Sequence, residues 1–161
     1  MSIHIMRRST SKEVLLVGWA FVYYPFLTIC ALVHIAALRI RHRKPVMMLS
    51  GPWGSGDALA GNLRRMTEAG KTLSNHQDFV LFHQIPYGAM YSRFDPNHRL
   101  TKITIFYRPL CQWFLSGLVM MPTWEQSQGA SAERTAALAG RKIIYHLNED
   151  MQVILICPSP K

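Results

Sequence analysis

The sequence predicts an α/β protein with a small doubly wound parallel sheet of about five strands, preceded by one transmembrane helix. Two observations lead to this prediction. One long apolar segment without a formal charge lies near the N-terminus, and beyond residue 45 short apolar runs alternate with stretches of helical periodicity. Such alternation favours right-handed crossovers between parallel strands, and ligands of these sheets bind beyond the carboxyl ends of the strands.

The apolar segment covers residues 14–38, which is 25 residues and exceeds the roughly 20 needed to span a bilayer as a helix. It ends directly in a basic run, so we interpret it as a retained anchor rather than a cleaved signal peptide. A buried core helix is the alternative. Four Lys or Arg follow the segment and three precede it, which favours a single-pass membrane protein whose domain is cytoplasmic. The expected organisation is an N-terminal tail 1–13, a transmembrane helix 14–38, a basic linker 39–45 and a domain 46–161.

The charge distribution argues against nucleic-acid binding, although the formal net charge is +9. Residues 1–44 carry seven Lys or Arg and one acid, whereas residues 45–161 carry eleven and eight. Most of the positive excess therefore flanks the membrane segment, and we expect no nucleic acid as partner. Cys30, Cys111 and Cys157 lie far apart and the histidines are scattered, so we expect neither a disulfide framework nor a metal site, and no cofactor.

Along the predicted domain, residues 45–50 read as a buried strand that leads into a glycine-rich loop. Asp57 can cap the next helix, in which apolar residues recur at spacings of three and four from Leu59 to Leu73. Further strands are expected at 79–82, 118–122, 142–145 and 152–157, a mainly helical segment at 102–117, and a helix at 130–139 closed by Gly140. The loops 50–57, 83–87 and 123–129 should meet at one sheet edge, in a Rossmann-like or flavodoxin-like arrangement.

Two segments carry the chemical signal: Leu49-Ser50-Gly51-Pro52, and the stretch from Met121 to Glu133 that reads MPTWEQSQGASAE. We expect Glu133 in the first turn of its helix, where the helix dipole would keep the carboxylate ionised and aimed at the loop edge. The two segments resemble those of the nucleoside 2-deoxyribosyltransferase-like superfamily, particularly its small phage-borne members. The resemblance covers roughly residues 45–147, and it implies a nucleoside 2-deoxyribosyltransferase-like domain at 46–161.

The resemblance implies a covalent, retaining transfer in which Glu133 attacks the anomeric carbon of a deoxyribosyl group and expels the base. It implies a nucleoside or nucleotide substrate, and a possible homodimer, because relatives often complete their sites across a dimer. Gly129 would let the backbone approach the sugar, and Trp53 or Trp124 could stack on the base. The residues expected to bind substrate are Ser50, Gly51, Pro52, Trp53, Asp57, Trp124, Ser127 and Gly129.

The chain also departs from the pattern of the characterised transferases. Gly117 and Ser127 stand where those enzymes carry assisting aspartates, and Thr123 replaces a glycine. Glu125 or Asp57 is then the candidate proton donor. The activity can be transfer or hydrolysis of an N-glycosidic bond.

Two alternative functions that are not enzymatic stay open. One is a catalytically silent nucleotide-sensing or interaction module that uses the same pocket, and the other is a structural membrane protein of a phage or mobile element. At the level of single residues, Glu133 can be an ordinary helix acid and Trp124 a packing residue.

Overall fold

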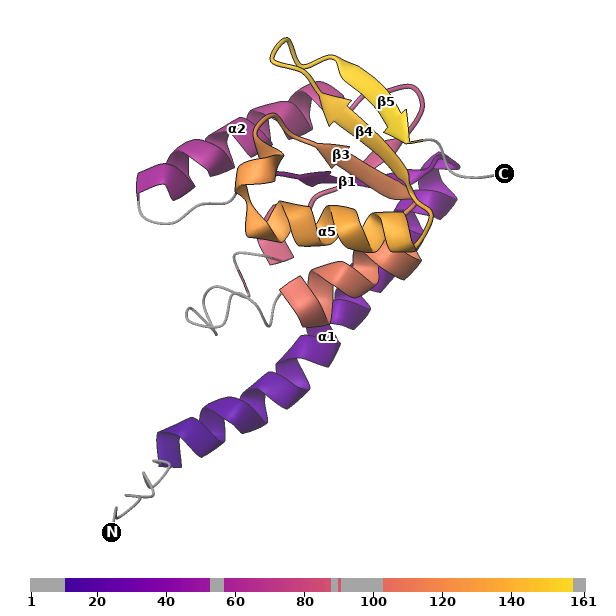
Figure 1. The fold of residues 1–161 in the computed structure, drawn as a ribbon. Coiled ribbons are helices and arrows are strands. Elements are labelled where there is room, and N and C mark those ends of the chain that lie inside the picture. Colours follow the sequence, from indigo (N-terminus) through magenta and orange to yellow (C-terminus); the bar gives the residue numbers. More distant parts are fainter. Residues whose placement is uncertain (1–10, 53–56, 88–89, 91–102, 158–161) are drawn as a thin grey trace.

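The computed structural model describes residues 11–52, 57–87, 90 and 103–157, and a five-stranded sheet forms the centre of this part of the chain (Figure 1). The strand order is β2-β1-β3-β4-β5, and the first four of these strands are mutually parallel. The predicted α/β class and the mostly parallel sheet are thereby confirmed. The strands are β1 (Val46–Ser50), β2 (Val80–Phe82), β3 (Gly117–Met120), β4 (Ile143–Leu147) and β5 (Val153–Cys157).

Strand β5 departs from the predicted wholly parallel sheet, because it runs antiparallel to β4. Only residues 148–152 connect the two strands, whereas a parallel crossover needs a dozen residues or more. The Asn148 side-chain oxygen accepts a hydrogen bond from the Gln152 backbone N–H at 2.7 Å, and Met151 adopts a φ of 61°. The connection is therefore a tight hairpin, and the expectation of a parallel last strand is wrong.

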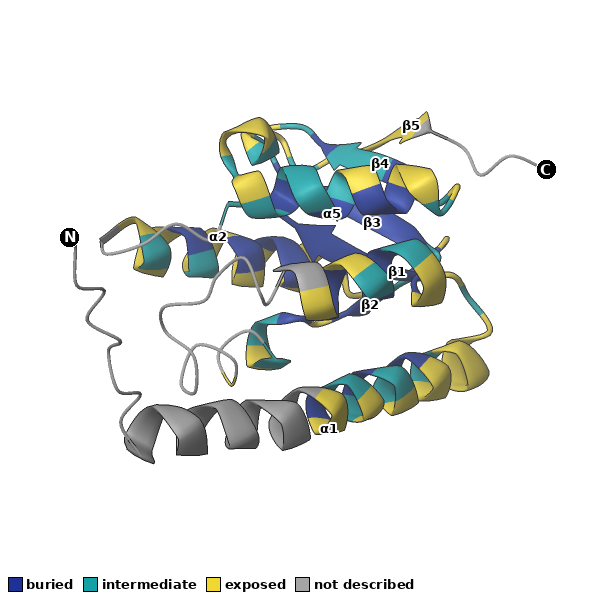
Figure 2. Cartoon of the chain, turned by 60° about the horizontal axis from the view of Figure 1, so that its bottom comes forward, coloured by how far each residue is buried: buried dark blue, intermediate teal, exposed yellow. Residues whose placement is uncertain are grey.

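Helices cover both faces of the sheet (Figure 2). On one face lies α2 (Asp57–Leu73), which buries Met66, Ala69 and Leu73 as its apolar spacing predicted. On the other face lie α5 (Gln128–Ala139) and the segment predicted to be mainly helical, which is wound as two π-helices, η1 (Ile103–Tyr107) and η2 (Leu110–Phe114). The apolar core thus forms two layers, one on each side of the strands.

Helix α1 (Ser11–His42) contains the predicted membrane segment and extends away from the sheet at its N-terminal end (Figure 1). Among the described residues it is the one helix long and apolar enough to cross a membrane, over Pro25–His42. Its C-terminal half packs on the same face as α5, where Leu27, Ala31 and Ile35 are buried. The helix thus also contributes to the core, and it continues through most of the segment expected as a basic linker.

Candidate functional site

Glu133 of α5 and Ser50 of β1 meet in the core, although 83 residues separate them in the chain. The Ser50 hydroxyl donates a hydrogen bond of 2.5 Å to Oε2 of Glu133. Ser50 is fully buried and Glu133 is 6% exposed. Because Ser50 is the last residue of β1 and pairs with Met120, the last of β3, the carboxyl group lies at the carboxyl edge of the parallel strands. This is the edge at which α/β sheets bind ligands.

The local sequence explains how Ser50 reaches this position. Side chains alternate along a strand, and Val46 and Met48 belong to the apolar layer beneath α5, so Ser50 faces the same way. Gly51 then allows the chain to pass close to the next strand, because a Cβ there would lie 2.9 Å from the Cβ of Met121. Ser50 of the Ser-Gly-Pro segment and the Glu133 carboxylate are therefore brought together.

The position of Glu133 within its helix differs from the prediction. The helix α5 begins at Gln128, and the Ser127 hydroxyl caps it by accepting a hydrogen bond of 3.3 Å from the Ala130 N–H. Glu133 consequently falls in the second turn, whereas the dipole effect is confined to the first. Burial raises the pKa of Glu133 from 4.5 to about 7, with the Ser50 hydrogen bond acting in the opposite direction. The expectation of a carboxylate kept ionised by the helix start is thus wrong, and both protonation states are populated near neutral pH.

Cys111 of η2 adds an apolar neighbour to this carboxyl group. Its thiol is buried, and its pKa is raised by burial and then by the nearby Glu133. The thiol is thus neutral at physiological pH and places no negative charge beside Glu133.

A second cluster of side chains, formed by Trp124, His146 and Arg134, lies at the same edge. Trp124 was predicted from the sequence, whereas His146 and Arg134 were missed. Trp124 contacts the His146 ring edge to face at a centroid distance of 5.7 Å, and the Arg134 guanidinium lies 5.0 Å above the Trp124 ring. The pKa of His146 is lowered by burial and then by Arg134, while Glu125 raises it. Nε of Arg134 and Nε2 of His146 are buried without a hydrogen-bond partner within the described part of the chain.

The register of the sheet shows where His146 lies relative to Ser50. Ser50 pairs with Met120, and Met120 pairs with His146 on β4. The Cα atoms of Ser50 and His146 are therefore two strands apart, about 10 Å. Alternation along β4, in which Ile144 faces α5, was the signal that could have placed His146 on the same face as Ser50.

The other predicted site residues have mixed outcomes. Trp124 is half-buried against the core and Glu125 is exposed, both in the short 3-10 helix η3 (Trp124–Gln126). Gly129 lies in the first turn of α5. Asp57 begins α2 and only its backbone is described, while Trp53 lies outside the described residues.

The three departures from the transferase pattern have local structural counterparts. A Cβ at Gly117 would lie 2.0 Å from the Ile143 carbonyl oxygen, so this position at the start of β3 holds no side chain. Ser127 is committed to capping α5. Thr123 has a φ of 63°, the left-handed conformation that glycine adopts without strain. The backbone at Thr123 thus favours glycine, which is the residue found there in the family that the sequence resembles.

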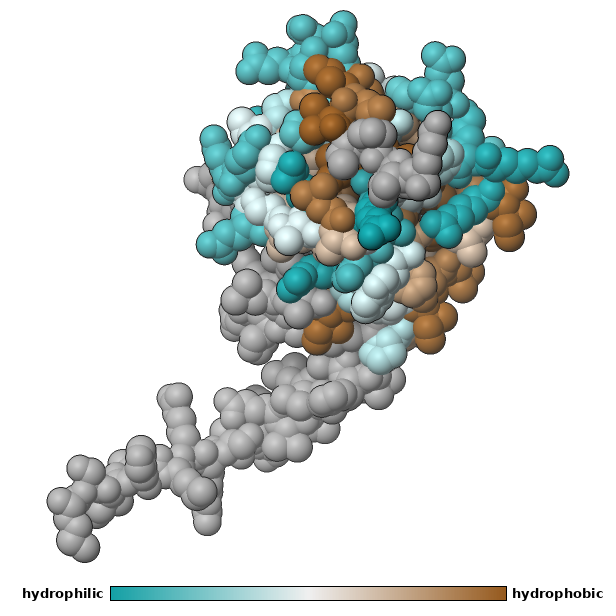
Figure 3. Space-filling view, turned by 45° about the vertical axis from the view of Figure 1, so that its right-hand side comes forward, coloured by the Kyte–Doolittle hydropathy of each residue, from teal (hydrophilic) through white to brown (hydrophobic). Residues whose placement is uncertain are grey.

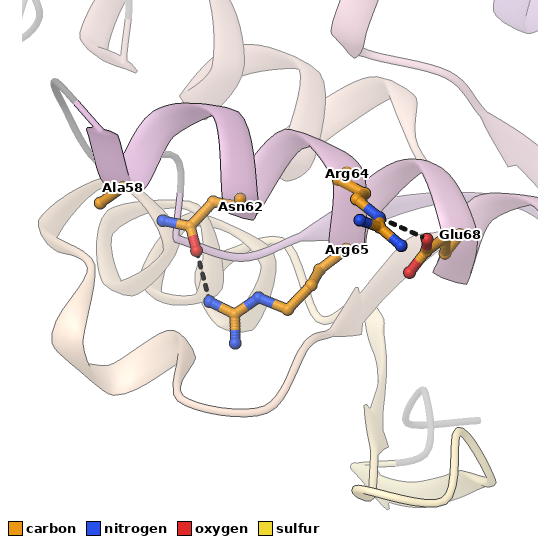
Figure 4. A pocket seen from close by; sticks show the side chains of 6 residues that line it. Ala58, Asn62, Arg64, Arg65 and Glu68 are labelled. Atoms are coloured by element: carbon orange, nitrogen blue, oxygen red, sulfur yellow. Dashed lines mark hydrogen bonds and ion pairs between the residues drawn. The ribbon is translucent and has the colours of Figure 1, made fainter.

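Glu133 lines neither of two cavities on the surface of the described residues. One, of about 480 Å³, is a hollow along the outer side of α2. Its arginines are held by neighbours on the same helix: Arg64 forms an ion pair with Glu68 at 2.9 Å, and Arg65 donates to the uncharged Asn62 side-chain oxygen (Figure 4). The other, of about 450 Å³, lies at the opposite sheet edge from Glu133.

The described residues contain no group of three His, Cys, Asp or Glu that could hold a metal ion. Comparisons with family models, with curated proteins and with solved structures give no match to this chain. A functional proposal therefore depends on the geometry around Glu133 and on the resemblance of its two sequence segments.

Proposed function

We propose that this chain is a membrane-anchored protein of the nucleoside 2-deoxyribosyltransferase-like superfamily, which cleaves or transfers at the N-glycosidic bond of a nucleoside or nucleotide. The observation that carries the proposal is the hydrogen bond between Ser50 and Glu133, because it joins the two segments that resemble the family. The strand order β2-β1-β3-β4-β5, with helices on both faces, supports a doubly wound, Rossmann-like fold for the domain.

In this proposal the Glu133 carboxylate is the nucleophile. One of its oxygens forms a bond to the anomeric carbon while the carbon–nitrogen bond breaks, and the base leaves with the bonding electrons and takes up a proton. Water or a second base then attacks the anomeric carbon and releases Glu133. The Ser50 hydroxyl holds one carboxylate oxygen, which orients the other toward the sugar. A buried anion stabilises the positive charge of an oxocarbenium-like transition state more strongly than a solvated anion does.

The proton for the departing base has to come from another group, and Glu125 is our first candidate. It is exposed on η3 and raises the pKa of His146 through its charge, so the two side chains lie near each other. We propose that Glu125 donates the proton and that His146 and Arg134, with their unpaired nitrogens, offer hydrogen bonds to the substrate.

The test is release of free base from a panel of deoxynucleosides and their monophosphates, measured by liquid chromatography with the purified full chain in detergent. We expect release with at least one substrate, and its loss in Glu133→Gln. The matched control is Glu68→Gln, which changes an exposed carboxylate on α2 and should leave release intact. The proposal fails if the unaltered chain releases no base from any member of the panel.

A catalytically silent nucleotide-binding module is the second candidate. The observation that favours it is that neither position of the two assisting aspartates carries an acid. Gly117 has no room for a side chain, and the Ser127 side chain caps α5. Titration calorimetry with the same panel separates the candidates. Binding without turnover supports the silent module, and absence of binding removes it.

We further propose that α1 anchors the protein in a membrane with the domain on the cytoplasmic side. The support is the apolar window Pro25–His42, of which only 17% is buried, together with the basic residues in the last turn of the helix. Extraction of membranes with alkaline carbonate tests the anchor. Retention in the membrane pellet is expected, and release into the soluble fraction contradicts it.

A further inference from the structure

Strand β5 forms one edge of the sheet, and β2 forms the other. Natural proteins commonly protect edge strands by keeping them short, by placing charges on them or by covering them with a helix. Strand β2 has three residues, and α1 lies along it, with His34 contacting the Phe82 ring edge to face at 5.4 Å (Figure 2). Within the described residues, β5 has none of these three kinds of protection.

The side chains of β5 are apolar and largely uncovered. The strand reads VILIC and carries no charge. Ile154 is 47% exposed, Leu155 50% and Ile156 48%. Because side chains alternate along a strand, these residues expose apolar surface on both faces of the sheet. Figure 3 turns this side of the molecule toward the reader and shows apolar side chains between hydrophilic ones. An exposed apolar edge strand is a site at which another strand associates.

The backbone of β5 also presents hydrogen-bonding groups on its outer side. At the turn before it, the Asn148 N–H donates to the Gln152 carbonyl at 3.1 Å. Bonded positions recur at every second residue of an antiparallel ladder, so the backbone of Ile154 is bonded to β4. Val153 and Leu155 consequently direct their N–H and C=O groups away from β4.

These outward groups fit an identical strand that is related by a two-fold axis. When Val153 of one copy lies opposite Leu155 of the other, the N–H and C=O groups of both residues are paired. Ile154 then lies on the axis and faces its own copy, at a position where opposite Cα atoms are about 4.5 Å apart. The side chains that meet are all aliphatic, and such cross-strand pairs stabilise a sheet. The strand is therefore complementary to itself.

The charges at the two ends of the β4–β5 hairpin favour the same partner. Exposed Glu149 and Asp150 lie in the turn between the strands, and Arg141 and Lys142 directly precede β4 at the other end. In the two-fold pair, the acidic turn of each copy lies at the basic end of the other copy. The separation is about 10 Å across two strand spacings, comparable with the screening length at physiological salt. A parallel copy would place acid beside acid.

We propose that two copies of this chain associate through β5, so that their two sheets continue into one across a two-fold axis at Ile154. The partner that β5 fits is an uncharged antiparallel strand with acidic residues at one end and basic residues at the other. A second copy of the chain has all of these features. The proposal goes beyond the chemistry at Glu133, and its test measures association alone, so the two proposals can fail separately.

Sedimentation equilibrium of the full chain in a density-matched non-ionic detergent tests the proposal. We expect reversible dimers with a micromolar dissociation constant, because one strand pair is a small interface. Ile154→Lys places like charges opposite each other on the axis and should weaken the dimer at least about ten-fold, as should Ile154→Glu. An equimolar mixture of the two variants should recover affinity to within about three-fold of the unaltered chain, because opposite charges then face each other.

The matched control is Ile105→Lys, which changes a similarly exposed isoleucine on η1 and should leave the dissociation constant unchanged. Recovery in the mixture also shows that both Ile154 variants are folded. The proposal is overturned if the unaltered chain stays monomeric up to about 100 μM, which would leave the edge to a strand of another protein. It is also overturned if either Ile154 variant alone dimerises like the unaltered chain, or if the mixture associates no more tightly than its components.

Discussion

Replacing Glu133 by glutamine should make the protein more stable at alkaline pH. The side chain is buried, and burial raises its pKa from 4.5 to about 7. Folding therefore has to desolvate a charge whenever the group is ionised. Raising a carboxyl pKa over this range corresponds to about 3 kcal/mol of stability lost above the folded pKa. Glutamine keeps the size of the side chain and can accept the Ser50 hydrogen bond, but it has no charge to desolvate.

The direction of the pH dependence follows from proton linkage. Between the unfolded pKa near 4.5 and the folded pKa near 7, the folded chain binds more protons than the unfolded chain. The stabilising contribution of Glu133 is therefore complete below the lower value and is lost as the pH rises through the upper one. The variant has no such titration, so the two proteins diverge only above the lower value.

Urea unfolding of both proteins in a mild non-ionic detergent, followed by tryptophan fluorescence, measures the effect. The unfolding free energy of Glu133→Gln minus that of the unaltered chain should rise by about 3 kcal/mol between about pH 4 and about pH 9. Other titrating groups are common to both proteins and cancel in the difference. A difference that is constant across this range, or that falls as pH rises, would refute the claim of a buried carboxyl with a raised pKa.

Three further substitutions test the account. Ser50→Ala removes the hydrogen bond that lowers the pKa of Glu133, so the pKa should rise above about 7, and an NMR titration of the labelled carboxyl that shows no rise would contradict this. Thr123→Gly relieves a left-handed backbone, so the free energy of unfolding should increase by about 1 kcal/mol and the urea midpoint should rise. A lower midpoint would show that Thr123 is not strained. Gly117→Ala places a Cβ 2.0 Å from the Ile143 carbonyl oxygen and should cost about 3 kcal/mol in the same assay, and a neutral effect would contradict the close strand contact.

The elements that were predicted correctly are those whose information is local. Residues at spacings of three and four marked the buried side of α2, and the buried run before Gly51 marked β1. Pro109 and its neighbours favoured a helix at 102–117 despite a strand-like run at Ile103–Tyr107, and the structure has helix there because that segment packs under α5. The direction of β5 depended on the length of one connection, which the alternation pattern does not take into account.

The rest depended on contacts between distant parts of the chain. Ser127 starts α5 two residues earlier than expected, and this small shift moves Glu133 from the first turn to the second. Alternation along β4 gives the face on which His146 lies, but its position beside the site depends on its register with β3, which no local pattern specifies. The packing of Leu27 on the sheet was not predictable either, because a helix that is apolar on all sides reads as a membrane span whether or not one side is covered by protein.

The most direct test of the central claim is a search for the covalent intermediate on Glu133. The full chain is mixed with the deoxynucleosides and their monophosphates, quenched in acid after short times, and digested for mass spectrometry. The account predicts a peptide with Glu133 that is heavier by one deoxyribosyl group, with or without its phosphate, and no such peptide in Glu133→Gln. Base release that continues at an unchanged rate in Glu133→Gln, or an adduct on a different residue, would contradict it.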